Sequence, residues 1–190
     1  MIVIAVILGV ILVWFWFIYN GLVISKNQVK NALSQIDVQL KRRHDLIPNL
    51  VEVAKGYLVH EKATLENVIN ARNVACQFTN HRADDGEQLS QMASAENVLS
   101  GALARFYAVA ENYPDLKADS VIKELFDELT YTENRIGFAR QHYNDSVMSY
   151  NNRREIFPNN LISGVFGFGE LFGLEFNDRS IKSPPTVRLG

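Results

Sequence analysis

Few residues in this chain have the type and spacing that catalysis or metal binding requires. The chain has four histidines, His44, His60, His81 and His142. None of them follows a glutamate by three residues, which is the pairing that holds a di-iron centre in helical bundles. The single cysteine, Cys76, does not belong to a cysteine and histidine set with the spacing of a zinc site. We therefore expect no catalytic residue, no metal site and no cofactor.

Two weaker patterns keep an enzyme or ligand carrier open as a less favoured alternative. His60 and Glu61 are adjacent, so on a helix their side chains point in different directions. Residues 167–173 contain three glycines that loosely resemble a phosphate-binding fingerprint. One residue too many precedes the last glycine, and no strand and helix unit surrounds the run. Both patterns are poor predictors of a site.

Two charged residues, Arg43 and Glu96, interrupt the apolar stripes of the helices that we expect. In one interpretation both side chains extend along the helix surface and reach water with their charged ends. In the other, the two residues pair inside a helical bundle and fix how its helices align. The sequence leaves both interpretations open.

The positions of the apolar residues predict an all-α fold. After the N-terminal stretch, apolar residues recur in steps of three and four to about residue 79, then over 87–112, and again from Asp119 or Ser120 to just before Pro158. Pro48 lies within the first stripe, which keeps its register across the proline, so we favour a kink over a break. The expected fold is an antiparallel bundle of three long helices, or four if the first helix breaks at Pro48.

The N-terminus predicts a transmembrane helix over residues 1–24. Residues 2–18 contain no charged side chain, and a helix from 2 to 24 would be about 33 Å long, enough to cross a bilayer. A cleaved signal peptide is the weaker alternative, because no basic residue precedes the run and no small-residue cleavage site follows it. The expected membrane-anchor residues are Ile2, Val3, Ile7, Leu8, Ile11, Leu12, Trp14, Trp16 and Tyr19.

Charge and composition predict where the rest of the chain lies. The first basic side chain, Lys26, follows the span, and several more come after it. The positive-inside rule then predicts a single-pass protein of the inner (cytoplasmic) membrane, with the N-terminus outside. The single cysteine fits a reducing compartment. The net charge of −2 gives no field that would attract nucleic acid, so no nucleic-acid partner is expected.

Beyond the span, we expect a cytoplasmic bundle over residues 25–156, a glycine- and phenylalanine-rich segment over 157–176 and a polar tail over 177–190. If the first helix leaves the membrane in one piece, the aromatic segment ends far from the bilayer. If the chain instead reverses at Pro48, the segment returns to the bilayer. We favour the first arrangement.

The sequence resembles the LemA family over nearly its whole length. The matching residues are 19–23, Asn27, Val29, Ala32, the long block 36–51, 55–57, His60, Glu61, Ala71, Arg72, Tyr143, Asn144 and 157–159. The resemblance implies a bacterial membrane protein with one N-terminal span, a cytoplasmic helical bundle and no established enzymatic activity or cofactor. A relative in magnetotactic bacteria that is implicated in forming magnetosome membranes suggests a role in membrane organisation.

The length of the first helix suggests self-association. A helix over residues 20–79 would be about 90 Å long, against about 39 and 50 Å for the next two, so part of its stripe would lack a partner within the chain. We therefore expect a non-enzymatic scaffold that forms homo-oligomers and organises the lipid bilayer or membrane-protein partners. The alternative is an adaptor subunit of a membrane enzyme such as a protease. The expected contact residues are Val29, Leu33, Ile36, Leu40, Lys41, Arg42, Arg43, Asp45, Phe157, Phe166, Phe168 and Phe172.

Overall fold

All the regular secondary structure is helical in the part of the chain that the computed structural model describes, residues 1–78 and 82–174. The helices are α1 (Ile2–Ala54), α2 (Lys62–Ala75), the 3-10 helix η1 (Cys76–Phe78), α3 (Gly86–Ala110), α4 (Pro114–Ala118), α5 (Ser120–Glu155) and α6 (Asn159–Phe166). The all-α prediction is confirmed. The predicted polar tail over 177–190, like residues 175 and 176, lies outside the described residues.

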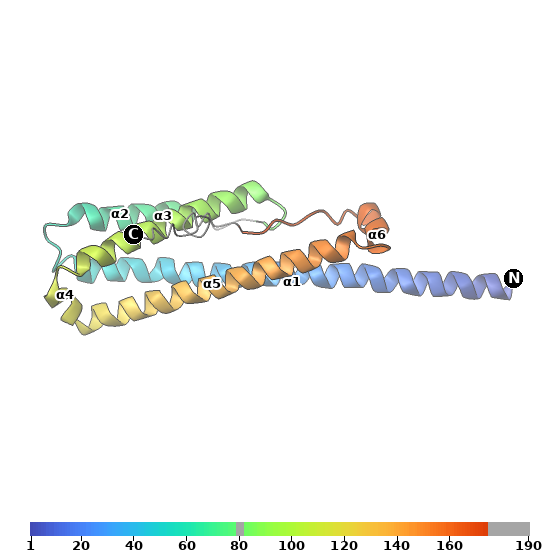
Figure 1. The fold of residues 1–190 in the computed structure, drawn as a ribbon, viewed down its shortest axis with the longest axis horizontal. Helices are drawn as coiled ribbons and strands as arrows, with labels where there is room; N and C mark the ends of the chain where they lie inside the picture. The colour runs from blue at the N-terminus through green and yellow to red at the C-terminus, as the bar shows by residue number, and fades with distance from the viewer. Residues whose placement is uncertain (79–81, 175–190) are drawn as a thin grey trace, which may run out of the picture.

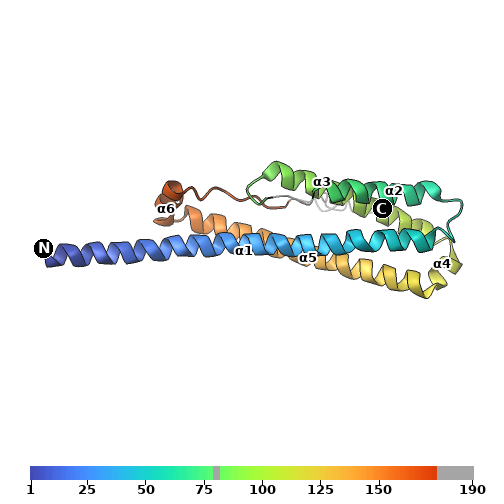
Figure 2. The same cartoon turned by 180° about the vertical axis from the view of Figure 1, so that it is seen from behind.

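The four longer helices α1, α2, α3 and α5 form an antiparallel bundle (Figure 1). The chain leaves along α1, returns along α2, leaves again along α3 and returns along α5. α1 and α5 lie side by side, and α2 and α3 form a hairpin against them (Figure 2). This is the four-helix alternative, although the chain reverses at residues 55–61 and not at Pro48. The expected single helix as far as residue 79 is wrong.

Pro48 lies inside α1 because α2 compensates for the hydrogen bond that a proline removes. A proline cannot donate a backbone hydrogen bond to the carbonyl four residues before it, which here belongs to His44. Arg72 of α2 supplies a donor instead, with its Nε 3.1 Å from the His44 carbonyl oxygen. The reversal that follows α1 is what brings Arg72 to this carbonyl.

The distal end of the bundle, away from the N-terminus, is held by a buried leucine and a helix cap. Leu58 in the turn after α1 is fully buried. The neighbouring Tyr57 donates its hydroxyl hydrogen bond to Asp119 over 2.8 Å. Asp119 also accepts from the backbone N–H groups of Val121 and Ile122 at 2.8 and 3.1 Å. It therefore caps α5, the helix that the sequence predicts to start at Asp119 or Ser120.

The apolar stripe of α1 is covered within the chain. Val29, Leu33, Ile36 and Leu40 are all buried. Their cluster includes Leu89 and Met92 of α3, Ile136, Tyr143, Val147 and Tyr150 of α5, and Leu171 and Leu174 of the C-terminal segment. Because the chain reverses at residues 55–61, α1 has intramolecular partners along this stripe. The expectation that part of this stripe lacks a partner within the chain, and so favours self-association, is therefore wrong.

Residues 157–166 of the C-terminal segment lie beside the exposed apolar stretch of α1 and not at the distal end of the bundle, which corrects our expectation (Figure 1). The Phe166 ring of α6 packs against Phe15 and Tyr19 of α1, with centroids 5.5 and 5.2 Å apart. Gly167 then ends α6 with a φ of 70°, a left-handed conformation that glycine adopts without strain. Residues 167–174 run back along α5.

We call residues 167–174 the strap, because four side chains of α5 bind its backbone. Asn151 pairs with both the N–H and the carbonyl of Leu171, at 3.2 and 2.8 Å. Asn144 does the same with Leu174, at 2.8 and 3.1 Å. Tyr143 and Tyr150 donate their hydroxyls to carbonyls of the strap. The spacing of seven residues between the two asparagines places them on one face of α5.

Candidate functional site

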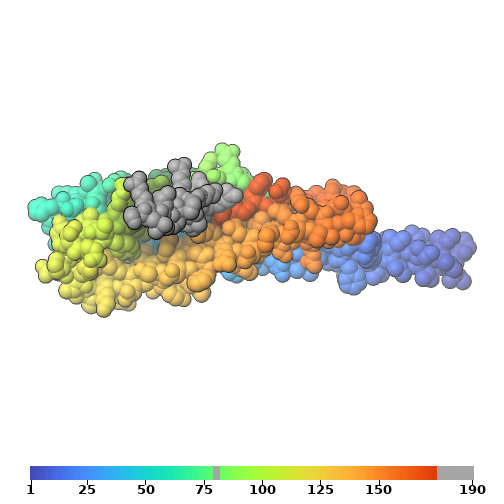
Figure 3. All heavy atoms as spheres, viewed as in Figure 1, coloured from blue at the N-terminus to red at the C-terminus, as the bar shows by residue number. Residues whose placement is uncertain are grey.

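The N-terminal third of α1 is an apolar helix with almost nothing packed around it. It projects beyond the rest of the molecule (Figure 3). The predicted anchor residues from Ile2 to Trp16 are all exposed, whereas Tyr19 is half-buried beneath the aromatic rings of the C-terminal segment. Among the described residues, α1 is the one helix that is long and apolar enough to cross a membrane. The structure thus holds one candidate span, and it continues directly into the bundle.

A cluster of polar side chains lies inside the bundle where α1, α3 and α5 meet. Arg43 and Glu96 form an ion pair, and each side chain is only 2% exposed. Arg43 also pairs with Glu133 of α5 and donates a hydrogen bond to Ser100 of α3 over 3.1 Å. Of the two interpretations of Arg43 and Glu96, the structure shows the pairing. Arg43 is therefore a link within the chain and not an exposed contact residue.

His44 joins this cluster to Cys76. Its Nε2 lies 2.8 Å from Glu96, and its Nδ1 lies 3.5 Å from the Cys76 sulfur. A thiol, an imidazole and a carboxylate in this order have the connectivity of a cysteine nucleophile with its base and orienting acid. Burial, together with the nearby charges of Arg43 and Arg72, lowers the pKa of His44 to about 4. Such a weak base cannot activate a thiol effectively near neutral pH.

The contact between His44 and Cys76 is not apparent from the local sequence. The two residues are 32 positions apart and meet because α2 folds back on α1. The one sequence feature that could have indicated the reversal after α1 is the glycine between Lys55 and Tyr57, since a glycine often follows the end of a helix.

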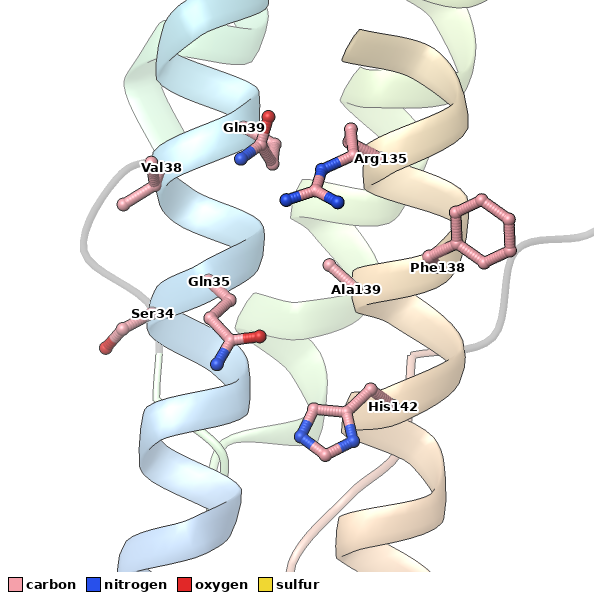
Figure 4. A pocket seen from close by; sticks show the side chains of 8 residues that line it. All are labelled: Ser34, Gln35, Val38, Gln39, Arg135, Phe138, Ala139 and His142. Carbon is pink, nitrogen blue, oxygen red and sulfur yellow. The ribbon is translucent and has the colours of Figure 1, made fainter. Parts of the chain in front are cut away.

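An open groove runs between α1 and α5 on the surface of the bundle. It is lined by Ser34, Gln35, Val38, Gln39, Arg135, Phe138, Ala139 and His142. In Figure 4, Gln35 and Gln39 of α1 and Arg135 and His142 of α5 point into the space between the two helices. Val38 and Phe138 stand at its two margins and are 62% and 70% exposed. The groove thus has a polar floor with two apolar edges.

Gln39 in this groove has an unsatisfied acceptor. Its Oε1 is buried and has no hydrogen-bond partner among the described residues. A buried polar atom without a partner costs free energy. The other polar side chains of the floor, Gln35, Arg135 and His142, suit a partner that brings polar side chains between apolar ones.

The predicted charged contact residues of α1, at positions 41, 42, 43 and 45, have different surroundings. Lys41 and Asp45 are exposed, as an intermolecular contact requires. Arg42 pairs with Glu128 of α5, and its guanidinium lies over the Tyr131 ring at 5.7 Å. Of the predicted charged contact residues, Arg42 and Arg43 therefore form ion pairs within the described chain, and Lys41 and Asp45 are the two that remain candidates for an intermolecular contact.

The four predicted phenylalanines of the C-terminal segment also differ in their surroundings. Phe157 is largely exposed, and Phe166 is exposed on one side while it packs on α1 with the other. Phe168 packs against Tyr19 with centroids 5.6 Å apart. Phe172 lies in the strap against Gly86 at the start of α3, where a Cβ would stand 3.1 Å from its ring. Three of these rings thus close the bundle on itself.

Comparison with known proteins shows the family. A model of the LemA family matches residues 32–189. Protein LemA of Metamycoplasma hominis is 26% identical over 153 residues, which cover 78% of this chain and 67% of that protein. Magnetosome protein MamQ 2 of Paramagnetospirillum magneticum is 23% identical, and magnetosome protein MamQ of Magnetospirillum gryphiswaldense is 21% identical. The aligned region covers 79% of this chain and 62% of each of the two MamQ proteins.

Proposed function

This chain belongs to the LemA family, and we propose that it is a non-enzymatic, membrane-anchored scaffold that self-associates and organises the membrane around it. The observation that carries the proposal is the continuity of α1. One helix of 53 residues contains both the exposed apolar stretch and the central helix of the bundle. The bundle is therefore fixed to its anchor without a flexible linker, as a structural role requires.

The orientation follows from charge. The described part of α1 has no basic side chain before Lys26, and Lys26 and Lys30 lie exposed just beyond the apolar stretch. The positive-inside rule places this side in the cytoplasm and the N-terminus outside, in the inner membrane. The bundle then stands on the cytoplasmic face.

The buried cluster supports a non-enzymatic role. Arg43 and Glu96 are each only 2% exposed and pair with each other. A paired buried charge set of this kind is a device for aligning helices, and we assign it that role.

The surface that we assign to self-association is the groove between α1 and α5. Anchored copies in one membrane share one orientation, so their lateral faces meet at a high effective concentration. The groove runs along such a lateral face, and Val38 and Phe138 give it two exposed apolar edges. The relatives include proteins named for the magnetosome, and we propose that this chain likewise organises a membrane.

The test is the mass of the full-length protein in mild detergent or lipid nanodiscs. We expect a discrete oligomer for the wild type, and dissociation when Phe138→Glu or Val38→Glu places a charge at the groove. Val98→Glu is the matched control, because Val98 is also 62% exposed but lies on α3. Circular dichroism checks that each variant is folded.

A wild-type monomer at cellular concentrations would contradict self-association. If the monomer instead forms a one-to-one complex with a membrane enzyme, and Phe138→Glu disrupts that complex, the adaptor alternative replaces the scaffold. If Val98→Glu and Phe138→Glu dissociate the oligomer equally, the groove is not the contact.

A further inference from the structure

Residues 156–166, which we call the foot, carry an apolar surface that nothing in the described chain covers. Its exposed apolar side chains are Ile156, Phe157, Leu161, Val165 and Phe166. Val165 is 80% exposed and Phe157 is 73% exposed. α6 itself contains no charged residue. A concentrated exposed apolar surface of this kind marks an interaction site.

The position of the foot indicates which surroundings its exposed apolar side chains contact. Phe166 packs on Phe15 and Tyr19, so α6 sits beside the last turns of the apolar stretch of α1. A helix rises 1.5 Å per residue, and a hydrocarbon core of about 30 Å spans about 20 residues, which from Ile2 ends near Gly21. Residues 15–19 therefore lie at the edge of the core. The foot is at the same height.

The foot is held in place by contacts on both sides. Arg153, just before it, donates hydrogen bonds to the Gly21 carbonyl at 3.0 Å and the Ser25 hydroxyl at 2.8 Å. After the foot, the strap is bound to α5 through Asn151. Ile162 is buried and fixes the rotation of α6, which leaves Leu161 and Val165 outward. The apolar surface is thus a fixed part of the fold.

We propose that the foot lies in the bilayer interface, at the boundary between headgroups and acyl chains of the leaflet through which α1 leaves the membrane. An amphipathic segment in this layer buries its apolar side chains among the upper acyl carbons. The exposed Lys26 and Lys30 of α1 stand just outside this layer, where they complement anionic headgroups. The inference goes beyond the scaffold proposal and rests on only one part of it, the membrane anchor.

The consequence is a second membrane contact beside the span. A transmembrane helix alone occupies a narrow cross-section through both leaflets. The foot adds volume to the leaflet through which α1 leaves the membrane, at the level of its headgroups only. Each chain therefore takes up unequal area in the two leaflets, and the lipid surface itself is the partner that the foot fits.

The test is site-directed fluorescence of the full chain in vesicles of phosphatidylcholine and phosphatidylglycerol. Single cysteines in a Cys76→Ser background carry an environment-sensitive dye at Val165 or Phe157 in the foot. Val10→Cys reports on the span and Val121→Cys on the distal end of the bundle. Nitroxide groups near the lipid headgroups should quench the two foot labels, and their emission should shift to the blue. The Val121 label should show neither change.

The outcomes separate this proposal from the previous one. Foot labels that respond like the Val121 label, while the Val10 label is quenched by lipid nitroxides, would overturn the foot and leave the anchor in place. Foot labels that are shielded from water but not quenched by lipid would also overturn it, because a second copy or another protein would then cover them. The mass of the particle tests self-association alone and does not decide this point.

A second variant tests directly whether the outward apolar side chains of the foot contact the lipid. Leu161→Asp together with Val165→Asp places two charges on outward positions, which leaves the buried Ile162 in place. With Phe157→Cys as the reporter, this variant should lose the blue shift and most of the quenching. Retained quenching would contradict a role for the apolar surface.

Discussion

At the scale of single residues, Pro48 and Arg72 act as one unit. Proline leaves the His44 carbonyl without its helical donor, and Arg72 donates a hydrogen bond to that carbonyl instead. We expect Arg72→Ala to reduce the free energy of unfolding by about 1–3 kcal/mol, because the carbonyl is then unsatisfied. In a Pro48→Ala background the backbone N–H of residue 48 can donate to the same carbonyl, so the loss should be smaller.

A double-mutant cycle measured by unfolding of the full chain checks this expectation. The control is Arg42→Ala, which removes an arginine whose partner, Glu128, is a partly exposed side chain and not a backbone carbonyl. If the losses from Arg72→Ala are equal in both backgrounds, Pro48 does not create the site that Arg72 fills.

His44 should make stability depend on pH. Its pKa is lowered from 6.5 to about 4 in the folded state, first by burial and then by the neighbouring Arg43. Above pH 6.5 both states are neutral at this residue. As the pH falls from 6.5 towards 4 the unfolded chain takes up the proton first, so stability is lost progressively, by about 3 kcal/mol in full.

The measurement is the difference in pH dependence between the wild type and His44→Gln. Glutamine removes the titration and keeps a polar side chain beside Glu96. Carboxylates that do not contact His44 affect both proteins alike and cancel in the difference. Parallel curves from pH 7 to pH 4.5 would show that His44 is not the titrating group.

At the scale of elements, the strap depends on side chains of α5. Asn151→Ala removes both hydrogen bonds to Leu171, so we expect local opening of residues 167–174 that is easier by about 1–3 kcal/mol. Hydrogen exchange of these amides should accelerate, while α2 stays protected. The neighbouring Asn152 is exposed and provides the control, Asn152→Ala. Equal exchange in the two variants would mean that packing of Leu171 and Leu174 alone holds the strap.

Features that depend on residues close together in the sequence could be predicted, and features that depend on residues far apart could not. The stripes of α3 and α5 and the Asp119 cap are set by residues within a few turns of one another, so periodicity and cap chemistry predict them. The reversal after Ala54 depends on burial of Leu58 and on contacts with Asp119, which is far away in the sequence. A stripe that continues in register across such a turn cannot reveal it.

The same difference applies to the candidate sites. Hydropathy predicts the span because a membrane acts on each residue separately. Arg43 and Glu96 stand out as charges on apolar stripes, and the structure pairs them. By contrast, the contact of His44 with Cys76 and the position of α6 depend on the reversal that the sequence did not show. Because the predicted chain lacked this reversal, the prediction placed the aromatic segment at the distal end of the bundle. The structure places α6 at the opposite end.

At the scale of the whole molecule, the anchor and the bundle cannot be separated into independent units. Tyr19 supports the rings of the C-terminal segment, Leu22 is fully buried in the bundle, and Ser25 binds Arg153. These three residues follow one another within two turns of α1. The candidate span therefore ends inside the fold, where the C-terminal segment packs against it.

The unbroken α1 also acts as a lever. A span responds to a change in bilayer thickness by changing its tilt. The part of α1 within the bundle, residues 22–54, is about 50 Å long, so a change of about 10° in tilt moves its distal end sideways by about 9 Å. A thinner or thicker membrane would thus be converted into a displacement at the turn around Leu58, far from any lipid.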